Sequence, residues 1–355
     1  GIVGATGMVG QRFISLLKDH PWFEVNCVAA SARSAGKTYR EAVGERWAFA
    51  WEIPEKVAGM TVVDAADIDE VSKHVDFVFC AVDMKKDEIR ALEEAYAKHE
   101  IPVVSNNSAC RGIEDVPMVV PEINADHLAV IEAQKKRLGT KNGFIAVKPN
   151  CSIQSYVPAL TPLLDFEPEK VSVCTYQAIS GAGKTFKTWP EMVDNVIPYI
   201  GGEDEKSENE PLKLWGHVED GKIVNAALPV ISAQCLRVAC SDGHMAAVSV
   251  SFKKKPTIEQ IKERWANYET EAQRLELPSA PKPFLQYFED PSRPQTRLDR
   301  DFQNGFGVSI GRLREDKLFD YRFVCLSHNT VRGAAGGGIL TAELLCRKGY
   351  IPHRV

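Results

Sequence analysis

The sequence predicts an α/β protein built from two domains. Three observations support this prediction: the chain has 355 residues, its first half alternates short apolar runs with amphipathic stretches, and its second half has longer apolar runs separated by polar loops. A single hydrophobic core stops growing near this length, so two cores are expected. Alternating strands and helices are typical of a parallel sheet, whereas the second half fits a mixed or antiparallel sheet better.

The first half is expected to begin with five strands and two helices. In the second of these helices, Ile89, Leu92 and Tyr96 recur at the three-to-four spacing of a helix face. Together these elements resemble a dinucleotide-binding sheet. The expected strands are Gly1–Val3, Val25–Ala30, Thr61–Val63, Phe77–Ala81 and Pro102–Ser105, and the expected helices are Val9–Lys18 and Lys86–His99.

The character of the chain changes after the apolar run Phe144–Val147. Longer strands are expected at Val171–Ile179, Ala226–Val230 and Met245–Phe252, with polar loops between them such as Gly201–Pro211. A last helix, Ile339–Arg347, follows a glycine-rich run and is expected to pack on the first domain. We therefore predict one domain from residues 1–149 plus 330–355 and a second from residues 150–329.

Composition limits the possible functions. The 43 Lys and Arg against 48 Asp and Glu give a net charge of −5 with no long block of one sign, so no nucleic-acid partner is expected. No apolar run approaches the roughly 18–20 residues that cross a bilayer, and from Gly1 onward the sequence has no basic-then-apolar stretch, so no leader is expected. The nine cysteines are too few and too irregular for a disulfide framework. We expect a soluble, cytoplasmic protein with free thiols and no membrane partner.

A glycine loop, Gly4-Ala5-Thr6-Gly7-Met8-Val9-Gly10, separates the first apolar run from the first helix. At that place backbone N–H groups and a helix N-terminus hold a pyrophosphate, and glycine lets the phosphates approach closely. The glycines are spaced G-x-x-G-x-x-G rather than G-x-G-x-x-G, which alone is weak evidence for dinucleotide binding. The alternative is that the loop is only a tight turn. Its position at the start of the alternating half favours a dinucleotide site, with contacts from Gly4, Thr6, Gly7, Met8 and Val9.

The end of the second strand indicates which dinucleotide is bound. An NAD site places an acidic residue there, about 20 residues after the glycines, to accept the ribose hydroxyls. Residues 31–37 contain no acid and instead provide Ser31, Arg33 and Ser34, with Lys37 close behind. Hydroxyls and a guanidinium suit a 2′-phosphate, so NADP is predicted; a solvated basic loop is the alternative.

Cys151 is the candidate nucleophile. It follows the strand Phe144–Val147 and precedes Ile153–Leu164, which is expected to be helical at least at its beginning. A thiol at a helix N-terminus has a lowered pKa. Pro158 and Pro162 predict a kink or an early end beyond the first turn. The other cysteines are explained as core residues or lack ligand spacing, so no metal site is predicted.

Four ordered motifs, together with the glycine loop and the last helix, resemble the aspartate-semialdehyde dehydrogenases over essentially the whole chain. Their details are more similar to the archaeal and fungal branch than to the enterobacterial one. The fold implied is a Rossmann-type NADP-binding domain plus an α+β catalytic and dimerisation domain of the glyceraldehyde-3-phosphate dehydrogenase-like kind. The motifs are Pro149-Asn150-Cys151-Ser152, Tyr176-Gln177-Ala178-Ile179-Ser180-Gly181-Ala182-Gly183, Arg237-Val238 with Gly243-His244, and Asn329-Thr330-Val331-Arg332-Gly333-Ala334-Ala335-Gly336.

The resemblance implies NADPH-dependent reductive dephosphorylation of L-aspartyl-4-phosphate to aspartate 4-semialdehyde, in lysine, threonine and methionine biosynthesis. Cys151 would attack the acyl phosphate and form a thioester. His244 would act as general acid and base with a pKa near its usual 6.5. Gln177 would orient the thiol, and the N–H of Cys151 would help to hold the oxyanion. A homodimer or homotetramer is expected.

The substrate has a carboxylate, an amine and a phosphate, so its site needs charges of both signs. By the resemblance, Arg237 would bind the α-carboxylate and Glu210 the α-ammonium. Arg111 and Lys213 are both candidates for the phosphate. The remaining expected contacts are Asn150 for the substrate and Ser180, Gly181 and Asn329 for the cofactor.

Three other functions compete. Malonyl-CoA reductase and N-acetyl-gamma-glutamyl-phosphate reductase are the two enzymes that the same resemblance allows. Their substrates, however, carry no free amine with which Glu210 could pair. A non-catalytic NADP-binding regulator would bind the cofactor without thiol chemistry. That function would make the joint presence of Cys151, Gln177, Arg237 and His244 a coincidence.

Overall fold

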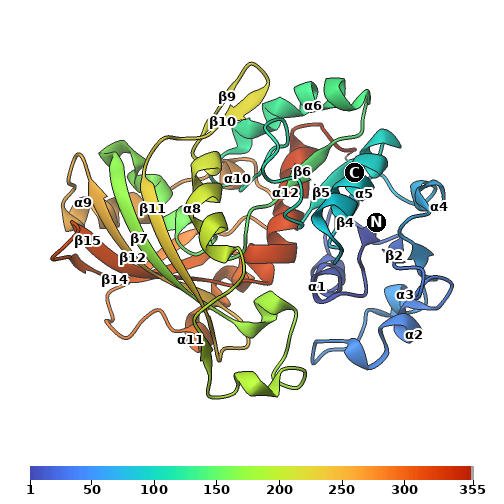
Figure 1. Ribbon diagram of the computed structural model, residues 1–355, viewed down its shortest axis with the longest axis horizontal. Helices are drawn as coiled ribbons and strands as arrows, with labels where there is room; N and C mark the ends of the chain where they lie inside the picture. Colours follow the sequence, from blue (N-terminus) through green and yellow to red (C-terminus); the bar gives the residue numbers. More distant parts are fainter. Residues whose placement is uncertain (353–355) are drawn as a thin grey trace.

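The computed structural model describes residues 1–352 and contains two sheets that stand side by side (Figure 1). The first is a six-stranded sheet in the order β3-β2-β1-β4-β5-β6, and every neighbouring pair is parallel. The predicted α/β first half is therefore confirmed, with strands shorter than expected. Their bounds are β1 Ile2–Val3, β2 Val28–Ala30, β3 Val63–Asp64, β4 Val78–Cys80, β5 Val103–Ser105 and β6 Ile145–Val147.

Helices cover the faces of this sheet. The first helix, α1, begins at Met8 directly after Gly7 and buries Phe13, Ile14 and Leu17 against the strands. Phe13 stacks on Phe79 of β4 at a ring separation of 4.4 Å. Both long helices predicted for this half are confirmed. The helices are α1 Met8–Leu17, α2 Tyr39–Val43, α3 Glu55–Ala58, α4 Ile68–Ser72, α5 Lys86–Lys98 and α6 Ile131–Leu138.

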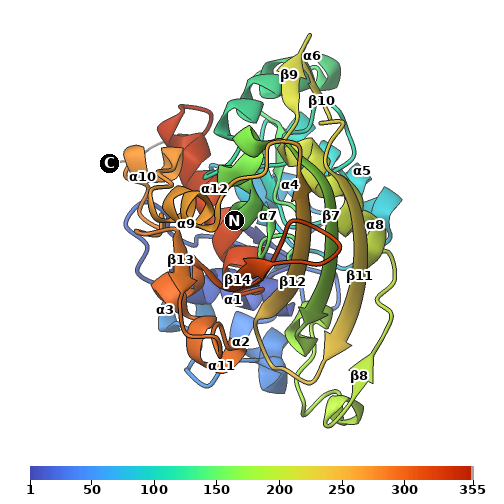
Figure 2. The same ribbon diagram turned by 90° about the vertical axis from the view of Figure 1, so that its left-hand side faces the viewer.

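The second sheet has seven strands in the order β13-β14-β15-β12-β7-β11-β8 (Figure 2). Two of its pairs, β11 with β7 and β13 with β14, are parallel and the others are antiparallel, so the expected mixed sheet is confirmed. Its strands are β7 Pro168–Gln177, β8 Val196–Ile197, β11 Val230–Val238, β12 His244–Phe252, β13 Leu285–Phe288, β14 Val308–Glu315 and β15 Tyr321–Ser327. A separate hairpin joins β9 His217–Glu219 to β10 Lys222–Val224.

Two expectations for this half are wrong. The strand expected at Ala226–Val230 begins only at Val230, because β11 runs onward from there. The polar loop expected at Gly201–Pro211 is instead the helix α8, Glu203–Leu214, which packs against β11. Pro211 lies inside this helix and cannot donate a hydrogen bond to the carbonyl of Ser207. The hydroxyl of Tyr156 donates to that carbonyl instead, at 2.7 Å.

The remaining helices surround the second sheet. They are α7 Val157–Leu160, α9 Ile258–Ala266, α10 Glu271–Arg274 and α11 Thr296–Asp299. Within residues 1–352, no helix is long and apolar enough to cross a membrane.

The last helix, α12 Gly336–Arg347, lies between the two sheets and contacts α1 and β5 (Figure 1). This confirms that the end of the chain returns to the first half. A π-helical turn, Val331–Ala335, precedes it. In that turn the fully buried Arg332 pairs with Glu122, which comes from the first half of the chain. The division into residues 1–149 plus 330–355 and residues 150–329 stays a prediction.

Candidate active site

Cys151 lies just beyond the carboxyl end of β6 and keeps part of its surface exposed. The residues after it form successive turns, and helix α7 begins only at Val157. The side-chain oxygen of Asn150 accepts both the N–H and the hydroxyl of Ser152, each at 2.7 Å. Since this contact bends the chain at Cys151, the helical first turn expected there is absent. A helix dipole therefore does not act on the thiol.

The surroundings of Cys151 act on its thiol in both directions. Burial raises the pKa of Cys151 above its usual value, and the negative charge of Glu203 raises it further. The cations Lys148, Arg111 and Arg237 oppose this shift and lower it in part. The expectation of a lowered thiol pKa is therefore wrong for the protein without its ligands. The three cations Lys148, Arg111 and Arg237 nevertheless lie close enough to the sulfur to favour a bound anion there.

The late motifs of the chain meet at this site. Asn329 accepts the N–H of Gly243 at 2.7 Å and donates to the hydroxyl of Ser180 at 2.8 Å, so it joins three separate motifs. A Cβ atom at Gly333 would lie 2.9 Å from the Cβ of Cys151, closer than real side chains pack. Glycine is thus required there for the π-helical turn to lie against Cys151.

His244 is the first residue of β12 and is completely buried. Its Nδ1 accepts the N–H of Ala178 at 3.1 Å, and its Nε2 has no partner among residues 1–352. Burial, and then the charge of Arg237, lower the pKa of His244 to about 3. The expected pKa near 6.5 is corrected accordingly: the imidazole is neutral at physiological pH.

Gln177 and Arg237 lie side by side at the ends of β7 and β11. Arg237 is buried and donates from Nη1 to the carbonyl of Ala178 at 2.8 Å. A Cβ atom at Gly181 would come within 2.8 Å of that Nη1 and within 3.0 Å of the His244 ring. The glycine therefore allows the loop after β7 to close over both groups.

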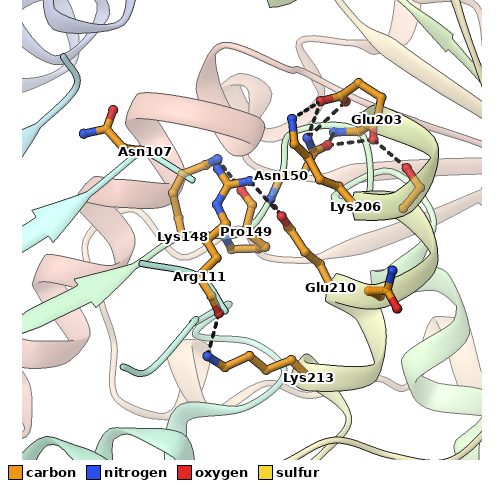
Figure 3. Close-up of polar contacts among 12 residues, drawn as sticks. Asn107, Arg111, Lys148, Pro149, Asn150, Glu203, Lys206, Glu210 and Lys213 are labelled. Atoms are coloured by element: carbon orange, nitrogen blue, oxygen red, sulfur yellow. Dashed lines mark hydrogen bonds and ion pairs between the residues drawn. The ribbon is translucent and has the colours of Figure 1, made fainter. Parts of the chain in front are cut away.

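Glu203, the first residue of α8, is a site residue that the sequence analysis missed. Its carboxylate is buried and accepts hydrogen bonds from Asn150 at 2.9 Å, from Gln177 at 3.2 Å and from Lys206 at 2.8 Å (Figure 3). It thus touches two of the predicted residues directly. A signal was present in the sequence: Glu203, Ser207, Glu210 and Leu214 recur at helical spacing. These residues belong to the buried face of α8, so the spacing could have predicted the helix and the burial of Glu203.

Two predicted substrate contacts have other partners. Glu210 pairs with Arg111 at 2.9 Å, and its other oxygen accepts the N–H of Asn150 at 2.5 Å. Lys213 donates to three backbone carbonyls, those of Arg111, Ile113 and Val116, at 2.6, 2.7 and 3.0 Å. An ammonium group has three donors, so none is left for a phosphate. The phosphate role of Lys213 therefore stays a prediction, and Glu210 is the counter-ion of Arg111 in this structure.

The glycine loop has the shape that a dinucleotide needs. Gly4 has a φ of +88°, and a Cβ atom on it would lie 2.2 Å from the carbonyl oxygen of Ala81. A Cβ atom on Gly10 would lie 2.4 Å from the carbonyl oxygen of Gly4. At Gly7 the space is open, and no side chain caps the N-terminus of α1. The N–H groups around Thr6, Met8 and Val9 are thus free of side-chain caps, as a pyrophosphate site requires.

The loop after β2 holds the residues predicted for the other end of a dinucleotide, and their role stays a prediction. Ser31 and Arg33 are exposed there, and Ser34 is buried, with its N–H bonded to the carbonyl of Ser31 at 2.8 Å. An exposed guanidinium beside hydroxyl groups is the kind of arrangement that binds a 2′-phosphate. Within residues 1–352, no group of three or more His, Cys, Asp or Glu is placed to hold a metal ion.

Two family models match the chain. The semialdehyde dehydrogenase NAD binding domain matches residues 1–131, and the semialdehyde dehydrogenase dimerisation domain matches residues 160–332. Together they account for most of the chain.

Relatives of known family match this chain over nearly its whole length. The aspartate-semialdehyde dehydrogenase of Aspergillus fumigatus is 44% identical over 99% of this chain and 98% of its own. That of Archaeoglobus fulgidus is 43% identical over the same shares. Among solved structures, the aspartate-semialdehyde dehydrogenase with NADP from Candida albicans has a TM-score of 0.89, 39% identity and 99% coverage of both chains.

Proposed function

This chain belongs to the aspartate-semialdehyde dehydrogenase family, and we propose that it reduces L-aspartyl-4-phosphate to aspartate 4-semialdehyde with NADPH and releases phosphate. One observation carries the proposal. A partly exposed thiol, Cys151, lies among the cations Arg111 and Arg237 and the carboxylate Glu203. A substrate with an acyl phosphate, a carboxylate and an ammonium needs that set of charges around its reacting carbon.

Cys151 would act as the nucleophile. Its sulfur attacks the acyl carbon, the bond between that carbon and the phosphate oxygen breaks, and phosphate leaves with the electron pair. The product is a thioester on Cys151. Arg111, already held in place by Glu210, is positioned to bind the phosphate as it leaves.

The two ends of the amino acid would be held by opposite charges. Arg237 uses one of its five donors for Ala178, which leaves others for the α-carboxylate. We assign the α-ammonium to Glu203 rather than to Glu210. Glu210 is held in a buried pair with Arg111, whereas the partner of Glu203, Lys206, is partly exposed. Asn150 and Gln177 would act by fixing the carboxylate of Glu203.

The cofactor would lie along the glycine loop, with its pyrophosphate at the N-terminus of α1 and its 2′-phosphate at Arg33. When bound, NADPH supplies the hydride that converts a thioester to an aldehyde. Asn329 would keep Ser180 in place beside the nicotinamide end. His244 would donate a hydrogen bond from Nε2 to the oxyanion.

The alternative functions lack this support. The relatives at 39–45% identity over nearly the full chain are aspartate-semialdehyde dehydrogenases. Malonyl-CoA and N-acetylglutamyl phosphate carry no ammonium group, so neither would bring Glu203 a positive charge beyond that of Lys206.

We also propose that the protein is a homodimer or homotetramer that associates through the outer face of the seven-stranded sheet. The matching family model is a dimerisation domain. Large apolar side chains around β8 and β11 are unusually exposed: Val230 at 64%, Val196 at 54% and Tyr176 at 38%. Light scattering after size exclusion tests this; a monomer at assay concentration would contradict it.

The nine cysteines are all unpaired, which supports our proposal that the protein works in a reducing compartment such as the cytoplasm. Fractionation of the source cells tests this location. Recovery with a secreted or membrane fraction would overturn it.

The substrate assignment is tested by assay in the oxidative direction. The expected result is phosphate-dependent NADP reduction with aspartate semialdehyde. Malonate semialdehyde with CoA, assayed beside it, tests the principal alternative. A preference for that pair would overturn the assignment.

A further inference from the structure

Arg332 is a buried cation that the proposed function has not used. It is the second residue of the π-helical turn before α12, and only 1% of its surface is exposed. The side chain of its ion-pair partner Glu122 is completely buried as well. Removing one partner of such a pair is costly, but replacing both by uncharged groups of similar size is often neutral. Stability alone is therefore a weak explanation for this pair.

The guanidinium of Arg332 joins three separate segments of the chain. Nη1 and Nη2 donate to the two carboxylate oxygens of Glu122, which lies between β5 and β6. Nε donates to the carbonyl of Phe306, just before β14. Nη1 also donates to Oε1 of Gln154 at 3.4 Å, and the guanidinium lies 4.6 Å from the centre of the Phe284 ring. Because the donors of an arginine form a rigid planar fork, these contacts fix the orientation of the side chain.

Two of the residues next to this guanidinium lead to Cys151. Gln154 lies three residues beyond Cys151 and is 2% exposed. The segment between them consists of turns, since α7 begins only at Val157. Gly333, the residue after Arg332, is the glycine whose Cβ would lie 2.9 Å from that of Cys151. Arg332 therefore holds the segment around Cys151 from two sides, through the side chain of Gln154 and through its own backbone.

The π-helical turn sets how closely this backbone approaches Cys151. The N–H groups of Gly333 and Ala335 donate to the carbonyls five residues earlier, at 3.0 and 3.2 Å. Turns of this wide kind are frequent at functional sites. Because Arg332 lies inside the turn and is tied to Glu122, a change in its side chain is transmitted to Gly333.

We propose that Arg332 is a positioning residue for Cys151: bonded to Glu122 and Gln154, it holds the turns after Cys151 and the π-helical turn in the arrangement that presents the thiol to the substrate. The inference rests on the proposed function, because it concerns the thiol that attacks. With 1% of its surface exposed, Arg332 acts through Gln154 and Gly333 and not by contact with the substrate. A displacement of about 1 Å from the attacking position can lower a rate by about 100-fold.

The mildest test removes the acceptor and leaves the ion pair intact. Gln154→Leu keeps a side chain of similar size and loses one hydrogen bond to the guanidinium of Arg332. It is expected to lower kcat by about 10-fold or more, while the KM values for aspartate semialdehyde and phosphate change by less than about twofold. Gln273→Leu removes a partly buried glutamine of α10 that donates to a backbone carbonyl, and it should leave kcat unchanged. An unchanged kcat in Gln154→Leu overturns the proposal.

Variants of the ion pair separate positioning from stability. Arg332→Met leaves Glu122 buried and unpaired, so the melting temperature should fall. The double variant Arg332→Met with Glu122→Gln removes both charges and should recover most of the melting temperature, while kcat stays at least about 10-fold below that of the wild type. Recovery of kcat together with the melting temperature would assign Arg332 a purely structural role and overturn the proposal.

Arg293 provides the matched control for the ion pair. It also pairs with a buried carboxylate, that of Asp299, and it lies 4.6 Å from the centre of the Phe288 ring. Arg293→Met should likewise lower the melting temperature, but it should leave kcat within about twofold of the wild type. An equal loss of kcat in Arg293→Met and Arg332→Met would mean that kcat follows stability, against the proposal.

Hydrogen exchange tests the inference without turnover. The N–H groups of Ser152, Ser155 and Tyr156 are all hydrogen-bonded within the turns after Cys151. In Gln154→Leu they should exchange about 10-fold faster or more than in the wild type, because the turns open more readily without their bond to the guanidinium. The glycine loop should exchange equally in both proteins. Equal exchange in the turns contradicts the positioning role.

The same measurement keeps the two proposals apart. If exchange in the turns is faster in Gln154→Leu but the wild type reduces no NADP with aspartate semialdehyde, the proposed function fails while the hold of Arg332 on the segment around Cys151 stands. If the wild type is active and neither exchange nor kcat responds to Gln154→Leu, the proposed function stands and the positioning role fails.

Discussion

The Nδ1 atom of His244 accepts a hydrogen bond from the backbone N–H of Ala178 at 3.1 Å. In a neutral imidazole one nitrogen accepts and the other carries the hydrogen, so the hydrogen of His244 lies on Nε2. Because the pKa of His244 is lowered to about 3, this neutral form is the one present at physiological pH. The unpartnered Nε2 of His244 is therefore a hydrogen-bond donor, and a thiolate or oxyanion beside it would be needed to raise its pKa.

Replacing His244 by alanine is expected to lower kcat by about 100-fold or more, the typical cost of losing an oxyanion donor. The rate of Cys151 alkylation by iodoacetamide at a fixed pH should change by less than about twofold, because a neutral donor does not deprotonate the thiol. Parallel steady-state and alkylation measurements check this. A fall in alkylation as large as the fall in kcat would show that His244 is the base for Cys151.

Cys151→Ala should lower kcat by at least about 1000-fold, since no other group can form the thioester. Binding of NADP, measured by calorimetry, should survive because the glycine loop is untouched. Cys174→Ala is the matched control: it changes a partly buried thiol of β7 that lies away from the reacting groups. Turnover that persists in Cys151→Ala would exclude the thioester mechanism.

Glu203→Gln should make the thiol of Cys151 more reactive toward iodoacetamide. The carboxylate raises the pKa of Cys151, so removing its charge lowers that pKa and increases the thiolate fraction near pH 8. The same change should raise the KM for aspartate semialdehyde by about 10-fold or more through the loss of the ammonium contact. Alkylation rates across pH measure the first effect and initial rates the second.

Glu205→Gln provides the control for this change, because Glu205 is exposed on the same helix. An unaltered alkylation profile in Glu203→Gln would mean that its carboxylate does not act on the sulfur.

Arg33→Ala should reduce the preference for NADPH over NADH by about 10- to 100-fold, because one charged hydrogen bond to the 2′-phosphate is lost. The ratio of kcat/KM for the two cofactors measures it. Arg40→Ala removes another exposed arginine nearby, one that pairs with Glu55, and should leave the ratio unchanged. If Arg33→Ala also leaves it unchanged, the loop after β2 does not select the phosphate.

Lys148→Met should stabilise the protein in the absence of anions. The pKa of Lys148 is depressed to about 7 in the folded chain, so between that pH and its usual range the unfolded chain binds more protons. The stability of the wild type therefore rises with pH across this window, and the full cost of the buried charge is present below it. The melting temperature should increase in Lys148→Met, and more at pH 6 than at pH 9. A lower melting temperature at pH 6 would show that the ammonium stabilises the fold.

Much of the fold follows from local patterns in the sequence. The alternation in the first half placed the parallel strands, and the glycine loop placed the start of α1 at Met8. Helix α8 was missed because its buried face is made of Glu203, Ser207 and Glu210, so a hydrophobic period was not visible. The turns after Cys151 were missed because Asn150 bonds to Ser152, a side-chain contact that competes with helix formation.

Cys151 became a site candidate through its position after an apolar strand. Arg237, His244 and Asn329 became candidates through motifs that resemble those of the aspartate-semialdehyde dehydrogenases. The sequence could not determine how charges pair. Glu210 and Glu203 lie on the same face of one helix, and only the position of Arg111 makes the first a counter-ion and leaves the second beside the thiol.

The sequence by itself therefore determined the class of fold and predicted the dinucleotide loop and the nucleophile, because these depend on residue types and spacings along the chain. Only the tertiary structure decided the ionisation of His244, the structural role of Lys213 and the placement of Lys148 beside Arg111 rather than beside a carboxylate. Those properties depend on burial and on partners that lie far away in the sequence, because charges interact through space and not along the chain.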